Sequence, residues 1–456
     1  LKTLLGFNIK AALCSPQELQ TAIDRYYPEG QQESITNIID QLSDDEDLQK
    51  FQDRGDSIDL ADIKEMIESN PVKKLLNLVL LQAIKEKASD IHFEPFEDEF
   101  KMRYRIDGVL YEMVPPPRYV ALAIASRIKV MANLDIAERR LPQDGRIELS
   151  LHGRPIDLRV AVLPTMFGES VVLRVLDRSN VQLSVDKIGM RDDELATFRQ
   201  LMRKPNGIII NTGPTGCGKT TTLYAALSEL NEPDVKILTA EDPVEYDIDG
   251  LIQTQVRPDV GLTFARALRS FLRQDPDIIL VGEIRDLETA QISVQASLTG
   301  HLVFTTLHTN DAPSAIARLM DLGMEPFLIT ATLEAIVAQR LVRRICSNCK
   351  AEYRPTEEQL MEVALRPEEV GDRVFFYGKG CDYCNNTGYR GRMGIYELMV
   401  LDDPLRELIM RKASTSILRR EAIKRGMRTL RETGLMAIYE GITTLDEVVK
   451  ETIIEE

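Results

Sequence analysis

Residues 213–220 read Gly213-Pro214-Thr215-Gly216-Cys217-Gly218-Lys219-Thr220. Two glycines separated by four residues, then Lys and Ser or Thr, form the P-loop pattern. The preceding run, 207–211, predicts a short buried strand, and the following run, 221–230, predicts a helix. A glycine-rich loop between a strand and a helix presents backbone N–H groups and a helix N-terminus to phosphate. The stretch therefore predicts a nucleotide site in an α/β fold, against the alternative of a chance glycine-rich turn.

Each residue type of the P-loop has an expected task. We expect Lys219 to reach the β- and γ-phosphates of ATP and the Thr220 hydroxyl to hold Mg²⁺. The other candidates for nucleotide contact are the rest of the loop and the next helical residue: Gly213, Pro214, Thr215, Gly216, Cys217, Gly218 and Thr221.

Composition limits the functional classes. The chain has 456 residues, which suggests about three domains. Its net charge of −16 argues against broad, non-specific nucleic-acid binding but leaves a local basic channel open. The apolar run 75–84 is interrupted by Asn77 and Gln82 and is too short to span a bilayer, and no leader peptide is evident. We therefore expect only peripheral membrane contact, and because the chain begins at Leu1 we expect an N-terminal part to be missing.

The patterning divides the chain into successive parts. Residues 1–59 resemble the end of a larger domain, with a helix at 16–27 and a solvated acidic linker at 41–59. Residues 60–183 combine helical segments at 63–87, broken at Asn70-Pro71, and 119–131 with short alternating runs separated by turns, which predicts an α+β domain with an antiparallel sheet. We expect its strands at 100–105, 109–114, 146–151, 156–163 and 171–176.

The P-loop belongs to the next part, residues 186–400. Short apolar runs at 207–211, 235–240, 278–281 and 302–306 alternate with helical segments, which predicts a parallel sheet with crossover helices. Residues 401–456 have helical periodicity with glycine stops and predict a small helical cap.

A second motif is the run 277–283, which ends at Glu283. It predicts a buried strand that delivers a carboxylate to its C-terminal end, where ligands of α/β sheets bind. We expect Glu283 to be the catalytic base or the residue that positions the attacking water, because phosphoryl transfer depends on positioning and charge neutralisation. The alternative is an ordinary acidic strand end.

A third group of carboxylates follows the predicted strand at 235–240. Glu241, Asp242 and Glu245 lie within five residues, and Pro243 fixes the turn between them. We expect Glu245, and after it Glu241, to lie near the metal and the nucleotide. The alternative is a solvated acidic loop.

A fourth motif places a histidine at each end of the strand predicted at 302–306. These are His301 and His308, two of the four histidines in the chain. A histidine at the C-terminal end of a central strand can donate to a γ-phosphate or sense its loss. We expect a functional role for His308, and for His301 a structural role is an equal alternative.

These four motifs, in this order, resemble the secretion ATPases of type II secretion and type IV pilus assembly, most of all the pilus extension ATPases. In that family they are the Walker A, Asp box, Walker B and His box motifs, and residues 264–277 resemble the signature that leads into Walker B. The resemblance extends from about Ile63 to the C-terminus. It implies a RecA-like P-loop ATPase domain preceded by an α+β domain, in a homo-hexameric ring with ATP between the two domains and at subunit boundaries.

The resemblance also implies roles for arginines. Arg159 and Arg174 match arginines of the N-terminal domain that reach the γ-phosphate in the family, and Arg269 and Arg273 match positions near the nucleotide. The alternation of apolar residues from 156 to 162 places Arg159 on the opposite strand face. One departure is Cys217, where the family usually has Ser. Because the loop acts through its backbone N–H groups, we expect little loss of function. A thiol beside phosphate is, however, a possible oxidation target.

Four cysteines form two C-x-x-C knuckles. Cys346 and Cys349 are separated from Cys381 and Cys384 by 31 residues, 350–380. Four thiolates suit a structural, tetrahedral Zn²⁺ within a module at about 340–395, although the loop is longer than is usual. Disulfides or redox chemistry are the alternatives, and a cytosolic ATPase makes disulfides unfavourable. In the related family, such modules are typical of extension and secretion ATPases rather than retraction ATPases.

The sequence thus predicts a cytoplasmic, Mg²⁺-dependent ATPase that docks on an inner-membrane platform protein and drives pilin assembly, with no nucleic-acid partner. The close alternative is the type II secretion ATPase. A ring motor that moves nucleic acid and a non-hydrolysing nucleotide-binding scaffold are further alternatives. The acidic charge balance opposes the first, and Glu283 with the intact Lys219-Thr220 pair opposes the second.

Overall fold

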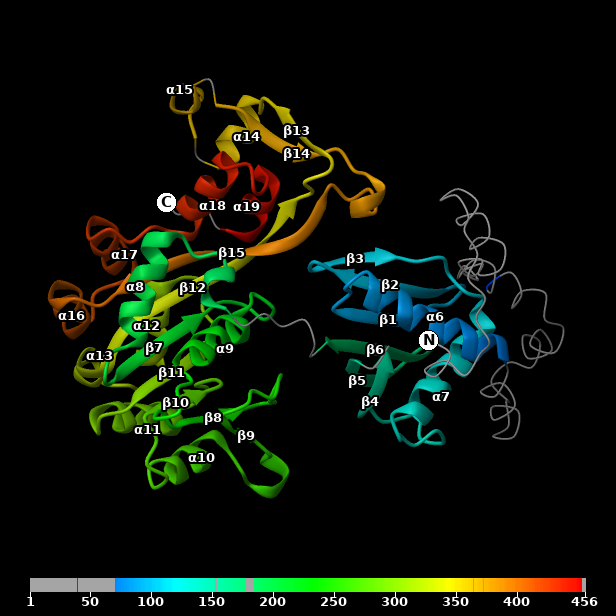
Figure 1. Ribbon diagram of the computed structural model, residues 1–456, viewed down its shortest axis with the longest axis horizontal. Helices are drawn as coiled ribbons and strands as arrows, with labels where there is room; N and C mark the ends of the chain where they lie inside the picture. Colours follow the sequence, from blue (N-terminus) through cyan, green and yellow to red (C-terminus); the bar gives the residue numbers. More distant parts are fainter. Residues whose placement is uncertain are drawn as a thin grey trace, which may run out of the picture. The chain divides into compact units, whose positions relative to one another are not determined.

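The computed structural model describes residue 39 and residues 70–151, 154–177, 184–363, 365–371 and 373–452. The helix expected at 16–27 and the acidic linker at 41–59 lie outside these residues. The described part forms two compact units, one within residues 1–179 and one within 180–456 (Figure 1).

Within residues 70–151 and 154–177, the first unit is an antiparallel sheet with two α-helices. Its six strands have the order β3-β2-β1-β6-β5-β4, and every pairing is antiparallel, as predicted. Apolar residues of both helices and of one sheet face form its core. The elements are α6 (Asn70–Lys85), β1 (Asp90–Pro95), β2 (Phe100–Ile106), β3 (Val109–Glu112), α7 (Ala121–Met131), β4 (Gln143–Leu151), β5 (Arg154–Thr165) and β6 (Gly168–Asp177).

Strand β5 shows how this sheet presents its arginines. Ile156, Leu158, Val160 and Val162 are buried, while Arg159 between them is half-buried on the other face. Arg159 is paired in register with Arg174 on β6, whose side chain is 56% exposed. The two arginines are therefore neighbours on the polar face.

The second unit is built on a seven-stranded sheet. Its order is β15-β12-β7-β11-β10-β8-β9, and only the edge strand β15 is antiparallel to its neighbour. The strands and their crossover helices are β7 (Gly207–Thr212), α9 (Lys219–Leu230), β8 (Ile237–Glu241), β9 (Ile252–Gln255), α10 (Phe264–Phe271), β10 (Ile278–Val281), α11 (Leu287–Leu298), β11 (Leu302–Leu307), α12 (Ala312–Asp321), α13 (Pro326–Thr332), β12 (Leu333–Ile345) and β15 (Tyr389–Val400).

Both faces of the central strands are covered, which explains their continuous apolar sequences. On β7, Ile208 and Ile210 pack into the core formed with α10, α11 and α12. Ile209 points the other way and packs with α9 and with α8 (Asp192–Met202). Successive side chains of a strand point to opposite faces, so one apolar run supplies two cores.

Two long strands extend beyond the sheet. In Figure 1, β12 and β15 run from the sheet toward the small antiparallel hairpin of β13 (Lys350–Tyr353) and β14 (Phe375–Gly378). The segment between those hairpin strands contains α14 (Glu357–Glu362) and α15 (Pro367–Val370). The C-terminal helices α16 (Asp403–Met410), α17 (Thr415–Lys424), α18 (Leu430–Tyr439) and α19 (Leu445–Glu451) belong to the same compact unit as the parallel sheet.

Strands β1, β9, β12, β13, β14 and β15 were not predicted from the sequence. Strand β1 alternates buried apolar residues with polar ones, and β12 carries five polar residues among its apolar ones: Glu334, Gln339, Arg340, Arg343 and Arg344. The polar residues of β12 interrupt a two-residue period, so its strand character depends on tertiary pairing. Strand β1 does have that period, but over only six residues. Elsewhere the predicted strands are found with ends displaced by a few residues; the strand expected at 235–240, for example, is β8 at Ile237–Glu241.

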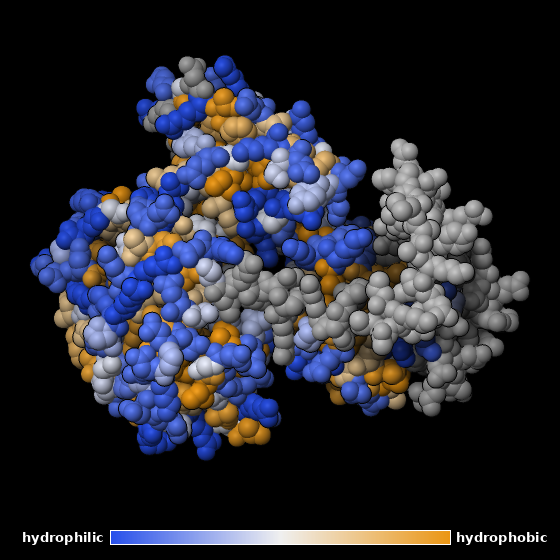
Figure 2. All heavy atoms as spheres, viewed as in Figure 1, coloured by the Kyte–Doolittle hydropathy of each residue, from blue (hydrophilic) through white to orange (hydrophobic). Residues whose placement is uncertain are grey.

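Among the described helices, none combines the length and apolar character that a bilayer-spanning helix needs. On the face shown in Figure 2, hydrophilic side chains separate the apolar ones into small groups.

Candidate active site

The P-loop connects β7 to α9, as the sequence predicted, and its glycines are required by geometry. Gly213, Gly216 and Gly218 have φ values of 150°, 80° and 92°, which L-residues rarely adopt. A Cβ atom on Gly213 would lie 2.6 Å from the Cys217 sulfur and 2.7 Å from the Gln339 carbonyl oxygen. The loop therefore packs so closely on itself and on β12 that only glycine fits at position 213.

Lys219, the first residue of α9, folds back onto the loop. Its ammonium group donates to the carbonyl oxygens of Gly213 at 2.7 Å and Pro214 at 3.0 Å. Burial lowers the pKa of Lys219, while the charge of Glu283 acts in the opposite direction. The exposed loop residues Pro214, Thr215 and Gly216 and the exposed threonines Thr220 and Thr221 surround this position.

Cys217 is buried inside the loop. Its side chain is 4% exposed, and burial raises the pKa of the thiol. Oxidation proceeds through the accessible thiolate, so this environment disfavours it. Cys217 thus fills space behind the loop, next to Gly213.

Two buried side chains of β12, which the sequence analysis did not identify, support the P-loop from behind. Gln339 donates to the carbonyl oxygen of Cys217 at 2.6 Å. Arg340 donates to the carbonyl oxygens of Gln339 at 3.0 Å and Asn310 at 2.8 Å, and burial lowers its pKa. The Arg340 side chain is only 7% exposed.

Glu283 follows β10, and its two carboxylate oxygens have different partners. Oε1 lies 3.4 Å from Nε2 of His308, which follows β11. Oε2 accepts a hydrogen bond of 2.7 Å from Nε of Arg285, and Arg285 in turn lies 3.5 Å from Asp242. The sequence motifs identified Glu283 and His308, but Arg285 was missed although it lies two residues after Glu283.

His301, at the opposite end of β11, has a local structural environment. Its Nδ1 lies 2.8 Å from the carbonyl oxygen of Ala296 and 3.1 Å from the hydroxyl of Thr299. These contacts close the turn between α11 and β11 at the edge of the sheet opposite to the P-loop.

Glu241 and Glu245 lie on either side of the cis peptide bond between Asp242 and Pro243. Glu241 is 4% exposed and accepts hydrogen bonds from the hydroxyls of Tyr224 and Thr239 and from the Gln253 amide. Glu245 is half-buried, and its backbone N–H donates to the Tyr224 hydroxyl at 3.3 Å. Tyr224, on α9, therefore ties the carboxylate turn to the helix that follows the P-loop.

The four arginines expected near the nucleotide occupy different places. Arg269 contacts Glu288 of α11, and Arg273 donates to the carbonyl oxygen of Arg269 on α10 at 2.7 Å. Arg159 and Arg174 belong to the first unit. Arg174 pairs there with Asp90 at 3.1 Å.

The four knuckle cysteines come together at the end of the β12–β15 pair. Their sulfur atoms lie within 4.8 Å of one another, with separations of 3.8 Å for Cys346–Cys381 and Cys349–Cys384 and 3.7 Å for Cys381–Cys384. A Zn–S bond of about 2.3 Å in a tetrahedron gives S–S separations of about 3.8 Å. The N–H groups of Cys381 and Gly388 also approach the Cys384 sulfur at 3.3 Å. The donor set therefore fits Zn²⁺, and the hairpin β13–β14 explains the long spacing between the knuckles.

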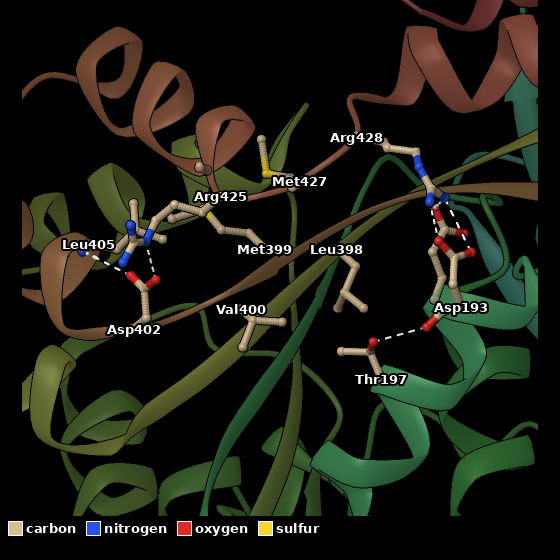
Figure 3. Close-up of a pocket in the computed structure, with 13 residues that line it drawn as sticks. Asp193, Thr197, Leu398, Met399, Val400, Asp402, Leu405, Arg425, Met427 and Arg428 are labelled. Atoms are coloured by element: carbon tan, nitrogen blue, oxygen red, sulfur yellow. Dashed lines mark hydrogen bonds and ion pairs between the residues drawn. The ribbon is translucent and has the colours of Figure 1, made fainter.

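A cavity of about 270 Å³ lies elsewhere in this unit, beside β15 (Figure 3). Arg425 pairs there with Asp402, and Arg428 with Asp193 and Glu194. Neither the P-loop nor Glu283 or His308 lines this cavity. The candidate active site is instead the P-loop together with the residues that follow β10 and β11.

Known proteins resemble this chain over most of its length. The family described as "Type II/IV secretion system protein" matches residues 65–450. The type IV pilus assembly ATPase PilB of Myxococcus xanthus is 50% identical over 454 residues, which cover 99% of this chain and 79% of that protein. The type II secretion system ATPase E of Vibrio cholerae is 51% identical over 391 residues, covering 86% of this chain and 77% of that protein.

Solved structures share the architecture. The pilus retraction motor PilT with bound ADP has a TM-score of 0.56 and 26% identity, covering 82% of this chain and 96% of PilT. The Yersinia pseudotuberculosis ATPase DotB has a TM-score of 0.62 at 19% identity, covering 83% of this chain and 94% of DotB, and supports the fold alone. With the family match, the relatives and the P-loop fold in agreement, the chain belongs to the family of type II and type IV secretion ATPases.

Proposed function

We propose that this chain binds ATP at the P-loop and hydrolyses it with Mg²⁺, as one subunit of a hexameric motor that drives type IV pilus assembly. The observation that carries the hydrolysis proposal is the position of Glu283 beside His308 at the carboxyl edge of the sheet. The P-loop follows β7, His308 follows β11 and Glu283 follows β10, and these three parallel strands are neighbours in this order. A nucleotide on the P-loop would therefore meet both side chains at one edge.

The residues of the site suggest how the reaction proceeds. The N–H groups of the loop and of the start of α9 bind the phosphates, and the Lys219 ammonium exchanges its carbonyl partners for phosphate oxygens. Arg285 holds Oε2 of Glu283, which leaves Oε1 to accept a proton from the attacking water. His308 lies against that same oxygen and orients it.

The donor set also fits a magnesium ion. The exposed Thr220 hydroxyl at the second position of α9 would hold Mg²⁺, in keeping with the P-loop pattern. The ion would neutralise charge on the phosphate oxygens. We propose that Glu245 and Glu241 support this region, with Glu241 acting through its hydrogen bond to Tyr224.

We further propose that arginines complete the site from beyond the P-loop. Arg159 and Arg174 form a neighbouring cationic pair on the polar sheet face of the first unit, and such a pair is suited to γ-phosphate charge. In a ring of identical chains they would act on the nucleotide during hydrolysis. Arg269, exposed on α10, and Arg273, exposed two residues after α10 ends, are proposed as further contacts to the nucleotide.

The machine that this motor serves is inferred from the proteins that the chain resembles. Support for pilus assembly comes from PilB of M. xanthus, whose similarity covers almost the whole chain. Support for the alternative, a type II secretion motor, comes from several secretion proteins that are 44–51% identical. In both cases the chain would work in the cytoplasm, at the inner-membrane platform protein, and zinc in the four-cysteine site would stabilise the module.

Two measurements test the proposal. Purified protein should form hexamers and hydrolyse ATP only with a divalent cation, without stimulation by DNA. Strong stimulation by DNA would favour a nucleic-acid motor, and no hydrolysis would favour a scaffold.

Deletion of the gene should abolish surface pili while leaving secretion of exoproteins intact. Intact pili with lost secretion would instead support the type II secretion alternative.

A further inference from the structure

Gln339 lies at the centre of the contacts that hold the P-loop in place. It is 1% exposed, and its strand, β12, pairs with β7, the strand that leads into the loop. The side-chain amide makes three hydrogen bonds: Nε2 donates to the carbonyl oxygen of Cys217 at 2.6 Å, and Oε1 accepts from Asn211 at 2.8 Å and from Thr222 at 2.9 Å. One side chain thus connects the strand before the loop, the loop itself and the helix after it.

The bond to Cys217 has a direct consequence for phosphate binding. In a trans peptide unit, the C=O of one residue and the N–H of the next point in opposite directions. The Cys217 carbonyl faces Gln339, so the Gly218 N–H faces away from β12. A phosphate-binding loop needs such N–H groups to converge on the anion, while their partner carbonyl groups find donors elsewhere. Gln339 supplies that donor for the Cys217–Gly218 peptide unit, which lies one unit before the Lys219 N–H group.

Neighbouring residues hold the Gln339 side chain and the P-loop backbone in fixed positions. A Cβ atom on Gly218 would lie 3.0 Å from Nε2 of Gln339, and one on Gly213 would lie 2.7 Å from its backbone oxygen. The same backbone oxygen accepts a hydrogen bond from Arg340. Thr222 also lies 3.5 Å from the hydroxyl of Tyr396, which is paired in register with Gln339 on β15. The amide is therefore fixed from several sides and has little freedom to release the loop.

We propose that Gln339 is a positioning residue for nucleotide binding: it holds the Cys217–Gly218 peptide unit so that the Gly218 N–H faces the phosphates. This inference rests on the proposed function, because it assumes that ATP binds at the P-loop. Gln339 touches neither the phosphates nor the metal, and acts only through the orientation of the loop backbone.

The test measures ATP affinity and thermal stability in the same variants of the full chain. Gln339→Met keeps the size of the side chain and removes its hydrogen bonds. The matched control is Thr433→Val, which removes another buried bond to a backbone carbonyl, the 2.8 Å bond from Thr433 to Tyr396. We expect both variants to lower the melting temperature without nucleotide, and only Gln339→Met to raise the Kd for ATP, by more than fivefold.

A second variant separates positioning from packing. In Gln339→Glu the carboxylate faces the Cys217 carbonyl oxygen without a proton to donate, whereas its protonated form can donate again. Burial raises the pKa of such a carboxyl group, and the nearby charges of Lys219 and Arg340 oppose that shift. We expect the Kd for ATP of Gln339→Glu, divided by that of the wild type at the same pH, to fall as the pH is lowered from 8 to 6.

The possible outcomes are distinguishable. Wild-type protein that does not bind ATP would refute the proposed function. If the wild-type protein binds ATP and a folded Gln339→Met variant changes the Kd by less than fivefold, the role of Gln339 is overturned while the proposed function stands. The same conclusion follows if the Kd of Gln339→Glu, relative to that of the wild type, is independent of pH. If Gln339→Met does not fold, Thr222→Val removes one of its hydrogen bonds; a Kd raised at least threefold would support the proposal, and a smaller change would overturn it.

Discussion

The Nε2 atom of His308 lies 3.4 Å from the Oε1 atom of Glu283, and the two residues follow neighbouring parallel strands of one sheet. Strand pairing fixes this relationship, because Val281 on β10 is in register with Thr305 on β11. Each carboxylate oxygen of Glu283 therefore has a basic side chain beside it: the His308 imidazole lies next to Oε1, and Arg285 donates a hydrogen bond to Oε2. Such a clamp holds a base in position before the substrate arrives, which lowers the reorganisation required during the reaction.

His308→Ala should lower kcat for ATP hydrolysis by about tenfold, because Glu283 loses the side chain that orients its Oε1 atom, and a tenfold change corresponds to about 1.4 kcal/mol in the barrier. The KM for ATP should change little, since His308 contacts the carboxylate rather than the P-loop. Steady-state assays check this, with His301→Ala at the opposite end of β11 as the control expected to retain its kcat. Equal kcat values for His308→Ala and the wild type would mean that His308 does not orient Glu283.

ATP affinity should fall as the pH rises through the alkaline range. Burial lowers the pKa of Lys219 below its usual value of 10.5 in the protein without nucleotide, and bound phosphates favour the charged ammonium. Above the pKa of the free protein, binding must therefore take up a proton, so the Kd increases with pH. Titrations with a fluorescent ATP analogue should show this trend in the wild type and a flatter profile in Lys219→Arg, whose guanidinium stays charged. The same slope in both proteins would contradict the assignment.

Cys346→Ser should release zinc and lower the melting temperature of the β13–β14 module. Replacing one of four thiolates removes a ligand from a tetrahedral site in which every position is filled by protein. Elemental analysis should find about one zinc per wild-type chain and much less in the variant. Cys217→Ser, which changes a buried cysteine outside the cluster, should keep its zinc. Wild-type protein without zinc would refute the site.

Arg159→Ala should slow hydrolysis by about 10³-fold while ATP affinity changes only a few-fold, because an arginine directed at developing phosphoryl charge acts mainly in the transition state. Arg118→Ala removes an exposed arginine of the same unit that bonds the Phe96 carbonyl oxygen, and should leave turnover unchanged. Single-turnover and binding measurements separate the two effects. Unchanged turnover in Arg159→Ala would exclude a role for this arginine in the reaction.

The parts of the fold that were predictable depend on local chemistry. The positive φ angles of the P-loop require Gly213, Gly216 and Gly218, so the loop is visible in the sequence. Strands that are covered on both faces need continuous apolar runs, which made β7, β10 and β11 recognisable. The cysteine knuckles were recognisable because metal ligands need fixed spacing within each pair.

The parts that were missed depend on contacts between distant residues. Gln339 meets the Cys217 carbonyl group across 122 positions of sequence, and a lone glutamine within a mixed run has no local signal for that partner. The role expected for Glu241 near the nucleotide stays a prediction, but its buried network with Tyr224 and Gln253 had no signal in the sequence. Arg285 is a local contact that could have been considered, because it lies only two positions after Glu283.

The measurement that tests the central claim most directly is ATP turnover and ATP binding in Glu283→Gln. The amide keeps the size of the side chain but cannot accept the proton of the attacking water, so kcat should fall at least a hundredfold, within the range of about 10²–10⁴ for general-base catalysis. The Kd for ATP should stay within a few-fold of the wild type, and Glu325→Gln, an exposed change before α13, should retain full turnover. Glu283→Gln with wild-type kcat would contradict the account.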